Sequence, residues 1–290
     1  MKKIKTMQDL FAECGKQGST STMDLRKRDL SYMAFDSAGL RLKDIDFTEA
    51  LLSHCDFSKV GLNSITFSKS NLYATVFEKA NGWGVSFEEA DLSGARFKEA
   101  NFIKTQFDRA NLKMANFSDI VFSQTSFQDI KGHDACFDGA NLRGANFRGA
   151  DLTNASFVEA ELENADFRGA NCTGVDFSKS DLSGANFEGA TFGENVFDET
   201  VFDKTVIDWR HLKGADLSTI QESAVLSVNH LELEETISVI HFFNEADIVF
   251  AGKWSGTLGD FKAWGESMSN KKHQMQILAM HQYFETRRNL

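Results

Sequence analysis

Hydrophobic residues recur along most of this chain with a period of five. In the segment ANLRGANFRGADL, residues 140–152, Leu142 and Phe147 mark two successive repeats. An α-helix repeats every 3.6 residues and a β-strand every two, so neither element explains this spacing. We call the recurring apolar residue the centre of its pentapeptide. Centres follow one another every five residues from Leu42 to Leu217, without insertion or deletion.

The positions around each centre are also regular. The residue two places before it is usually Ala, the residue one place before it is often Asn or Asp, and the two residues after it are polar or Gly. This pattern predicts that the centre and the small residue point inward while the other three face solvent. One set of centres consists only of Phe and forms the predicted core ladder. Its members are Phe47, Phe57, Phe67, Phe77, Phe87, Phe97, Phe107, Phe117, Phe127, Phe137, Phe147, Phe157, Phe167, Phe177, Phe187 and Phe197.

A weaker run of centres precedes the main one, and a two-residue slip near 40–42 joins the two phases. The early centres are Leu25, Leu30, Phe35 and Leu40.

Departures from the repeat mark places where the structure should change. Gly82 and Gly132 leave a centre without a side chain, and Trp83 follows the first of them. Trp83 either covers that gap, is simply exposed, or contacts a partner. Larger residues at the small inward position predict local widening or altered turns. They are Ile65, Val85, Ile120, Ile130, Val175 and Asn195.

The tandem pattern A[N/D][L/F]xx resembles that of the pentapeptide-repeat family, over about two-thirds of the chain. The resemblance implies a right-handed quadrilateral β-helix. Four pentapeptides then form a square coil of twenty residues, and neighbouring coils pair about 4.8 Å apart. About nine coils between residues 42 and 217 would give a rod on the order of 43 Å long. Two facing Phe ladders would fill its core, flanked by mostly aliphatic ones.

The ends of the chain depart from the repeat, and the open ends of a β-helix have to be covered. Residues 1–22 are expected to form an N-terminal cap with a short helix over 6–15, where Thr6 and Asp9 suit a capping box. The β-helix is expected over 23–220.

Residues 221–290 are expected to form a small α-helical module that caps the rod, forms a homodimer or docks a partner. Apolar residues occur there at helical spacing within residues 231–246 and again within residues 271–290. Trp254 and Trp264 lie between these segments and are candidate partner-binding residues.

Charge is uneven along the chain, whose net charge is −11. Residues 151–200 hold eleven acidic and two basic residues, a net charge of −9. A strongly acidic protein is a poor ligand for nucleic acid, so no direct nucleic-acid binding is expected. The acidic half of the rod either keeps it soluble or imitates a nucleic-acid backbone. The candidate contact residues are Glu159, Glu161, Glu163 and Asp166.

The residues offer no arrangement typical of an enzyme, cofactor site or metal site. Most rod Asp residues occupy repeat-determined positions, and Cys55 and Cys172 fall at inward positions suited to packing. His54 and His133 map to one side of the rod but about four coils apart, roughly 19 Å. That separation is too great for a shared metal. We expect no enzyme activity, no cofactor and no metal.

Four cysteines without a CxxC pair indicate free thiols in a reducing cytoplasm. A bacterial protein is expected. No apolar run is long enough for a membrane span.

Two functions remain open at this point. Some pentapeptide-repeat proteins imitate B-form DNA and bind type II topoisomerases, so the resemblance implies a protein-binding rod that acts on gyrase or topoisomerase IV. The mixed charges on one side of the rod, with Arg143, Arg148 and Arg168 as a basic patch, weigh against clean mimicry. The alternative is a scaffold or secreted effector, in which the rod is a spacer and residues 221–290 bind the partner.

Overall fold

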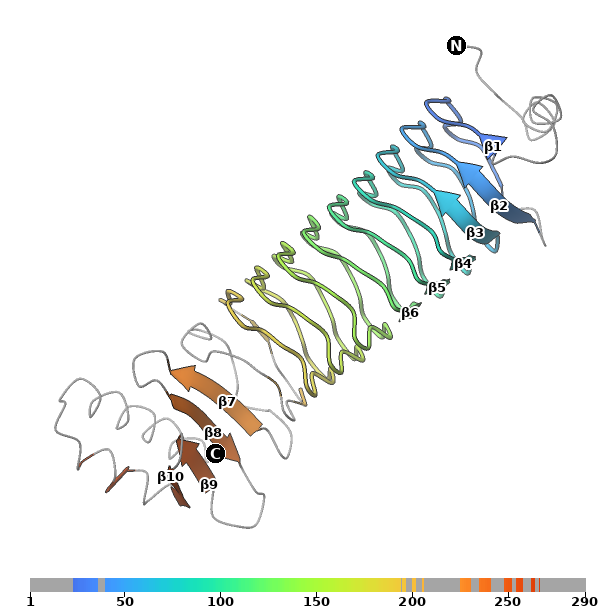
Figure 1. Ribbon diagram of the computed structural model, residues 1–290. Coiled ribbons are helices and arrows are strands. Elements are labelled where there is room, and N and C mark those ends of the chain that lie inside the picture. The colour runs from blue at the N-terminus through green and yellow to red at the C-terminus, as the bar shows by residue number, and fades with distance from the viewer. Residues whose placement is uncertain are drawn as a thin grey trace.

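The computed structural model shows a stack of square coils followed in sequence by a small antiparallel sheet (Figure 1). The structure describes residues 23–35, 40–193, 195–196, 200–201, 205, 225–230, 235–240, 248–251, 254–257, 262–263 and 266. The expected N-terminal helix over 6–15 and the last centres, Phe197 among them, lie outside the described residues.

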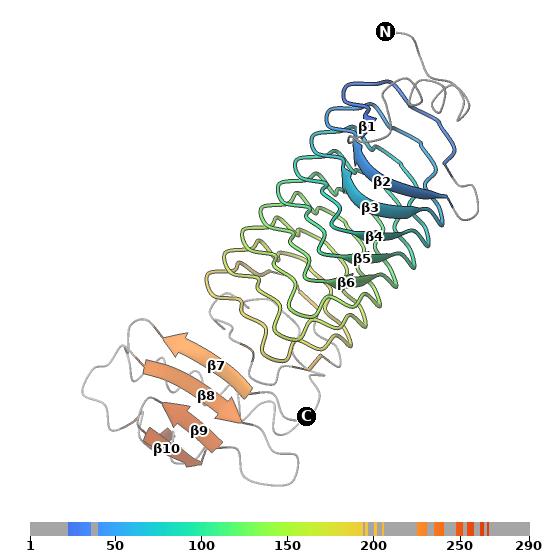
Figure 2. The ribbon, with the colours of Figure 1, turned by 45° about the vertical axis from the view of Figure 1, so that its right-hand side comes forward.

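Six short strands form one parallel sheet on a single side of the coils, in the order β1-β2-β3-β4-β5-β6 (Figure 2). Each strand belongs to a successive coil. Their bounds are β1 Met23–Asp24, β2 Arg41–Asp46, β3 Gly61–Thr66, β4 Asn81–Trp83, β5 Asn101–Ile103 and β6 Val121–Ser123.

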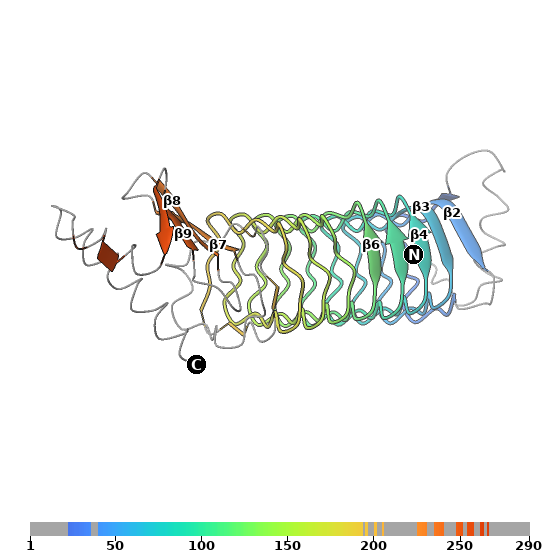
Figure 3. The same ribbon diagram turned by 90° about the horizontal axis from the view of Figure 1, so that it is seen from below.

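The coil has a length of twenty residues, as the family resemblance implied. Parallel bridges join residues twenty apart on all four sides, so the coils lie in register along the stack (Figure 3). We name the sides by their first centre: side A begins at Leu42, side B at Phe47, side C at Leu52 and side D at Phe57. Each side continues with every twentieth residue.

The first coil is two residues longer than the others. Asp29 pairs with Leu51 and Ala34 pairs with Asp56, a separation of 22 residues. The predicted slip is therefore confirmed, and the extra residues fall between the early centres and Leu42. Leu30 and Phe35 are buried in the same core as the later centres.

The core consists mainly of the two Phe ladders on sides B and D. Within a ladder the rings stack, as for Phe117 and Phe137 with centroids 5.0 Å apart. Between the ladders the rings meet edge to face, as for Phe107 and Phe117 at 5.6 Å. Both geometries suit the charge distribution of an aromatic ring. The predicted facing ladders are confirmed from Phe47 to Phe187.

Asn and Asp before the centre shape the backbone of each pentapeptide. Asp176 Oδ1 accepts a hydrogen bond from Ser178 N at 2.9 Å, and Asp181 Oδ1 accepts one from Ser183 N at 2.9 Å. Such Asx turns satisfy a backbone donor that the coil leaves unpaired. The many acidic residues at this position are therefore explained by the fold.

The backbone is more extended between sides A and B where the small inward position before the side B centre holds Ile65 or Val85. Ile65 lies within β3 and Val85 follows β4, so the altered turns predicted at these two sites are confirmed. When Ala145 takes the position, its N–H donates to Leu142 O at 2.9 Å and closes a turn. Ile120 and Val175 keep the hydrogen-bonded turn, so the altered turn predicted there was wrong. Their N–H groups donate to Phe117 O at 3.3 Å and to Cys172 O at 3.2 Å.

The C-terminal region contains a four-stranded antiparallel sheet in the order β10-β9-β8-β7. The strands are β7 Val225–His230, β8 Glu235–Ile240, β9 Ile248–Ala251 and β10 Trp254–Thr257. The helix predicted within residues 231–246 was wrong for residues 235–240, because a Thr-Ile-Ser-Val-Ile run favours a strand. The second predicted helix lies outside the described residues.

Candidate protein-interaction surfaces

The four candidate carboxylates lie in one coil but do not all face the same way. Glu161 and Glu163 are both on side A, before and after Leu162. Asp166 is on side B, and Glu159 lies at the corner that leads into side A. The structure therefore brings Glu161 and Glu163 together and places the other two beside them.

Arg143 meets two of these carboxylates from the preceding coil. Its Nη2 lies 2.7 Å from Glu163 Oε1, and its Nε lies 3.6 Å from Glu161 Oε2. Asn141 Nδ2 also donates to Glu161 Oε2 at 2.5 Å. Hydrogen bonding with Glu163 raises the pKa of Arg143 further above its ordinary value. The two carboxylates thus share one guanidinium and keep an excess of negative charge.

The other two carboxylates are paired as well. Arg168 donates to Asp166 through Nη2 at 2.6 Å and through Nε at 2.9 Å. This hydrogen bonding lowers the pKa of Asp166. Lys179 Nζ lies 3.9 Å from Glu159 Oε1. Two members of the expected basic patch, Arg143 and Arg168, are therefore partners of the acidic residues and not a separate patch.

Trp83 is exposed on side A, and Lys104 Nζ lies 5.4 Å from its ring centroid. Trp83 does not cover a gap, because the centre at Gly82 is occupied: a Cβ there would lie 2.5 Å from Phe102 Cε1. Ile103 and Val121 are also exposed on side A. Neither residue was predicted as a contact residue, although each is an apolar residue at an outward position where the repeat is polar.

A second exposed aromatic group was also missed. Tyr32 and His54 stack with ring centroids 4.9 Å apart, and Tyr73 meets His54 edge to face at 5.4 Å. Both Tyr side chains are exposed. The three residues come from successive coils at the N-terminal end of the rod, so the register of the coils creates the stack.

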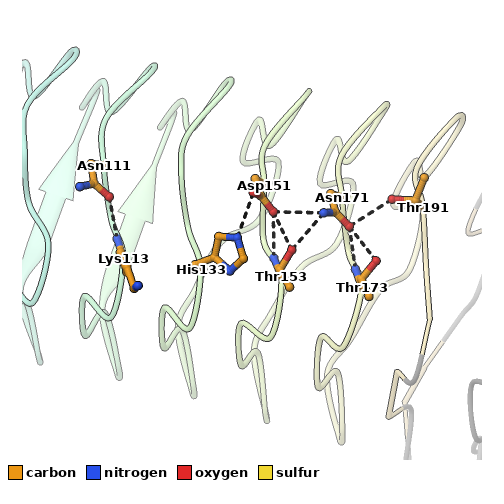
Figure 4. Close-up of polar contacts among 8 residues, drawn as sticks. All are labelled: Asn111, Lys113, His133, Asp151, Thr153, Asn171, Thr173 and Thr191. Carbon is orange, nitrogen blue, oxygen red and sulfur yellow. Dashed lines mark hydrogen bonds and ion pairs between the residues drawn. The ribbon is translucent and has the colours of Figure 1, made fainter.

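Side C carries a ladder of polar side chains that connect successive coils (Figure 4). Asn171 Nδ2 donates to Asp151 Oδ1 at 3.2 Å and to Thr153 Oγ1 at 3.0 Å. Thr191 Oγ1 donates to Asn171 Oδ1 at 3.2 Å, and His133 Nε2 lies 3.2 Å from Asp151 Oδ2. These groups satisfy one another, so the ladder supports the stacking of the coils.

The cysteines at inward positions are packing residues, as predicted. Cys55 and Cys172 are fully buried. Loss of solvation raises the pKa of Cys55 to about 12 and also raises the pKa of Cys172. Thiols with such pKa values are not nucleophiles near neutral pH.

The described ranges contain no group of three or more His, Cys, Asp or Glu side chains that could hold a metal ion. His54 is engaged with Tyr32 and Tyr73, and His133 with Asp151. In the same part of the chain, no helix combines the length and the apolar content that a bilayer span requires.

The two C-terminal candidates are only partly placed. Trp254 is the first residue of β10, and Trp264 lies outside the described residues.

The repeat geometry agrees with a comparison against protein families. The family model described as pentapeptide repeats matches in eight copies, over residues 62–102, 86–124, 135–171, 170–206 and 180–218, which together span half of the chain. The chain belongs to the pentapeptide-repeat family. A search of curated protein sequences found no match.

Several solved structures of pentapeptide-repeat proteins are similar to this chain. A trypsin-treated variant of QnrB1, a plasmid-mediated fluoroquinolone resistance protein, is 16% identical, covers 60% of this chain and 92% of its own, and has a TM-score of 0.47. HetL of the cyanobacterium Nostoc sp. strain PCC 7120, involved in heterocyst differentiation regulation, is 22% identical with coverages of 77% and 98% and a TM-score of 0.34. A protein of the Arabidopsis thaliana thylakoid lumen is 31% identical over 33% of this chain and 63% of its own, with a TM-score of 0.29.

Proposed function

We propose that this chain is a non-enzymatic rod that binds a partner protein through its surface. The inward positions are filled by stacked Phe, Leu and Ala side chains along the described coils, so recognition falls to the outward residues. A ladder of outward side chains repeated at about 4.8 Å presents a long, narrow contact surface, which suits a macromolecular partner better than a small ligand.

The partner proposed is a protein with a basic surface that normally holds DNA. The observation that carries this proposal is the net charge of −9 over residues 151–200, where eleven acidic residues meet two basic ones. Such a field attracts a basic surface and speeds association with it. Among DNA-binding proteins, a type II topoisomerase is the candidate that the family resemblance suggests.

A binding experiment on the full chain tests the proposal. Four carboxylates are neutralised together in one variant: Glu159→Gln, Glu161→Gln, Glu163→Gln and Asp166→Asn. The tagged wild type and this variant are then compared for capture of purified DNA gyrase and for capture of proteins from a bacterial lysate. Capture of a basic DNA-binding protein by the wild type, and its loss from the variant, supports the proposal. Equal capture by both chains contradicts it.

A matched control removes the same number of charges elsewhere on the rod. It carries Glu49→Gln, Glu89→Gln, Glu99→Gln and Asp119→Asn. Like Glu159, Glu161 and Glu163 of the first set, these carboxylates form ion pairs with cations of a neighbouring coil, but in the N-terminal half. The control should keep its partner, because the proposal concerns the position of the charge and not the total.

A second candidate function rests on the separate sheet β7–β10. Its antiparallel order and its sequence differ from the repeat, so the rod could serve as a spacer and this sheet as the docking module. Replacing Trp254 and Trp264 by Ala in the full chain distinguishes the two. Loss of the partner from this variant, with retention by the charge-neutralised variant, would favour the scaffold function.

A further inference from the structure

Exposed apolar side chains gather on side A over three successive coils. Trp83 is 49% exposed, Ile103 is 39% exposed and Val121 is 47% exposed. The register of β4 with β5 places Trp83 directly beside Ile103, and the register of β5 with β6 places Val121 beside Asn101. The three side chains therefore form one patch, centred on β5, at positions where the repeat calls for polar residues.

Opposite charges flank this patch at equal distances along side A. Arg41 and Lys43 lie on β2, three coils before β5, and Glu161 and Glu163 lie three coils after it. At about 4.8 Å per coil, each pair lies about 14 Å from β5. Arg41 and Glu161 both come immediately before a centre, and Lys43 and Glu163 come immediately after one. The basic pair and the acidic pair therefore occupy matching strand positions, the same number of coils from β5 in opposite directions.

We infer that side A binds a second copy of the same chain, with the two rods antiparallel and a two-fold axis along β5. A two-fold contact uses the same surface on both copies, so that surface has to be complementary to itself. Rotation about β5 sets Arg41 against Glu161 of the partner subunit. It sets Lys43 against Glu163 of the partner subunit.

The same rotation brings the apolar patches together. Ile103 lies on the axis and meets Ile103 of the partner subunit. Trp83 lies over the coil of the other copy that contains Val121, and beside the central pair of Ile103 side chains. Burial of exposed Trp and Ile side chains is the main favourable term at the centre of a protein interface.

Charge selects this arrangement over a parallel one. Rods related by an axis along their length would place Glu161 against Glu163 of the partner subunit, and like charges at that distance repel. The shared guanidinium of Arg143 leaves one of these two carboxylates in excess. In the antiparallel arrangement Arg41 supplies the missing cation, and Lys43, whose Nζ lies 3.7 Å from Asp44 Oδ2 within one copy, lies against Glu163 of the partner subunit. The inference needs no partner of another kind, but it uses Glu161 and Glu163, which the proposed function also uses. Substitution of Arg41 and Lys43 separates the two proposals, because it leaves both carboxylates in place.

A charge-swap experiment tests the contact by sedimentation equilibrium of the full chain over a range of protein concentrations. The wild type should show a reversible monomer–dimer equilibrium. R41E/K43E should weaken the dimer by about tenfold or more, because it sets acidic residues against acidic residues. Adding E161K/E163K to that variant should restore most of the affinity, because the ion pairs re-form with reversed signs. A merely structural effect of these exposed residues would not be reversed by the second pair.

Cross-linking tests the axis itself. In a chain with Cys14 and Cys136 replaced by Ser, Ile103→Cys should form a disulfide-linked dimer under mild oxidation, since residues on a two-fold axis come within the distance a disulfide spans. Thr173→Cys, which is exposed on the opposite side C, should form no disulfide-linked dimer under the same conditions. A monomeric wild type at all concentrations would overturn the inference. So would a dimer that R41E/K43E leaves unchanged.

Discussion

The ring of Phe102 occupies the space that a side chain at Gly82 would fill. A Cβ built on Gly82 would lie 2.5 Å from Phe102 Cε1 and 2.9 Å from the carbonyl oxygen of Leu62. Phe102 is itself fully buried and packs edge to face against Phe87 and Phe97. The Phe102 ring of the next coil therefore fills the space that a side chain at Gly82 would occupy, and the core of side A is continuous there.

Gly82→Leu should destabilise the rod, because it restores the repeat consensus at a position that is already full. We expect a loss of about 1–3 kcal/mol in the free energy of unfolding, as for other overpacked cores. Urea denaturation followed by circular dichroism measures it. Adding Phe102→Leu to Gly82→Leu should recover part of the loss, and a double variant no more stable than the single one would contradict this account of the packing.

Thr125→Val should stabilise the rod. The Thr125 hydroxyl is buried and makes no hydrogen bond to any described residue, so Val removes a buried polar group while keeping the shape. We expect a gain of about 1 kcal/mol in the free energy of unfolding. Thr75→Val is the matched control, because Thr75 Oγ1 donates to Leu52 O at 2.8 Å and its loss should destabilise by a similar amount. Equal effects of the two changes on the midpoint of thermal unfolding would contradict the difference in hydrogen bonding between the Thr125 and Thr75 hydroxyls.

The buried thiol of Cys55 should make stability fall at alkaline pH. Its pKa in the folded chain is about 12, whereas an unfolded Cys ionises near about 8.5. Above about pH 8.5 the Cys55 thiol ionises in the unfolded chain, whereas it stays neutral in the folded chain. The free energy of unfolding should then drop with rising pH, by up to about 1.4 kcal/mol per pH unit from this group, until pH 12. Cys55→Ala should show a shallower decline between pH 8.5 and 10.5 than the wild type, and identical slopes would count against the buried thiol.

Arg143→Ala should strengthen the attraction of the rod for a basic partner. Arg143 is the cation nearest to both Glu161 and Glu163, and its removal exposes their charge. The folded stability should change by less than about 1 kcal/mol, because the Arg143 guanidinium is exposed to solvent, which screens the pair. Binding of purified gyrase measured at several salt concentrations checks this prediction. An unchanged or weaker affinity would indicate that these carboxylates do not contact the partner.

Much of the rod could be predicted from its period and from the family that this period resembles. The resemblance implied a square coil of four pentapeptides, and the all-Phe centres then specified the two facing ladders. The slip near residue 40 was also readable, because the centres change phase there.

The remaining features could not be predicted for two reasons. Some depend on contacts between coils, and others lie in segments whose sequence fits both helical spacing and strand alternation. The pairing of Arg143 with Glu163 joins residues twenty apart and follows only once the coil length is known. Ile103 and Val121 become a patch for the same reason. The run around Ile237 fits helical spacing as well as strand alternation, and its β-branched residues decided for the strand.

The most direct test of the central claim is DNA supercoiling by purified gyrase with the full chain added at increasing concentration. The account predicts that the wild type inhibits supercoiling, that Arg143→Ala inhibits at lower concentration, and that the variant neutralised at Glu159, Glu161, Glu163 and Asp166 inhibits weakly or not at all. Inhibition that is the same for the wild type and the neutralised variant, or no inhibition by the wild type at any concentration, would contradict the assignment of the acidic half as a surface for this enzyme.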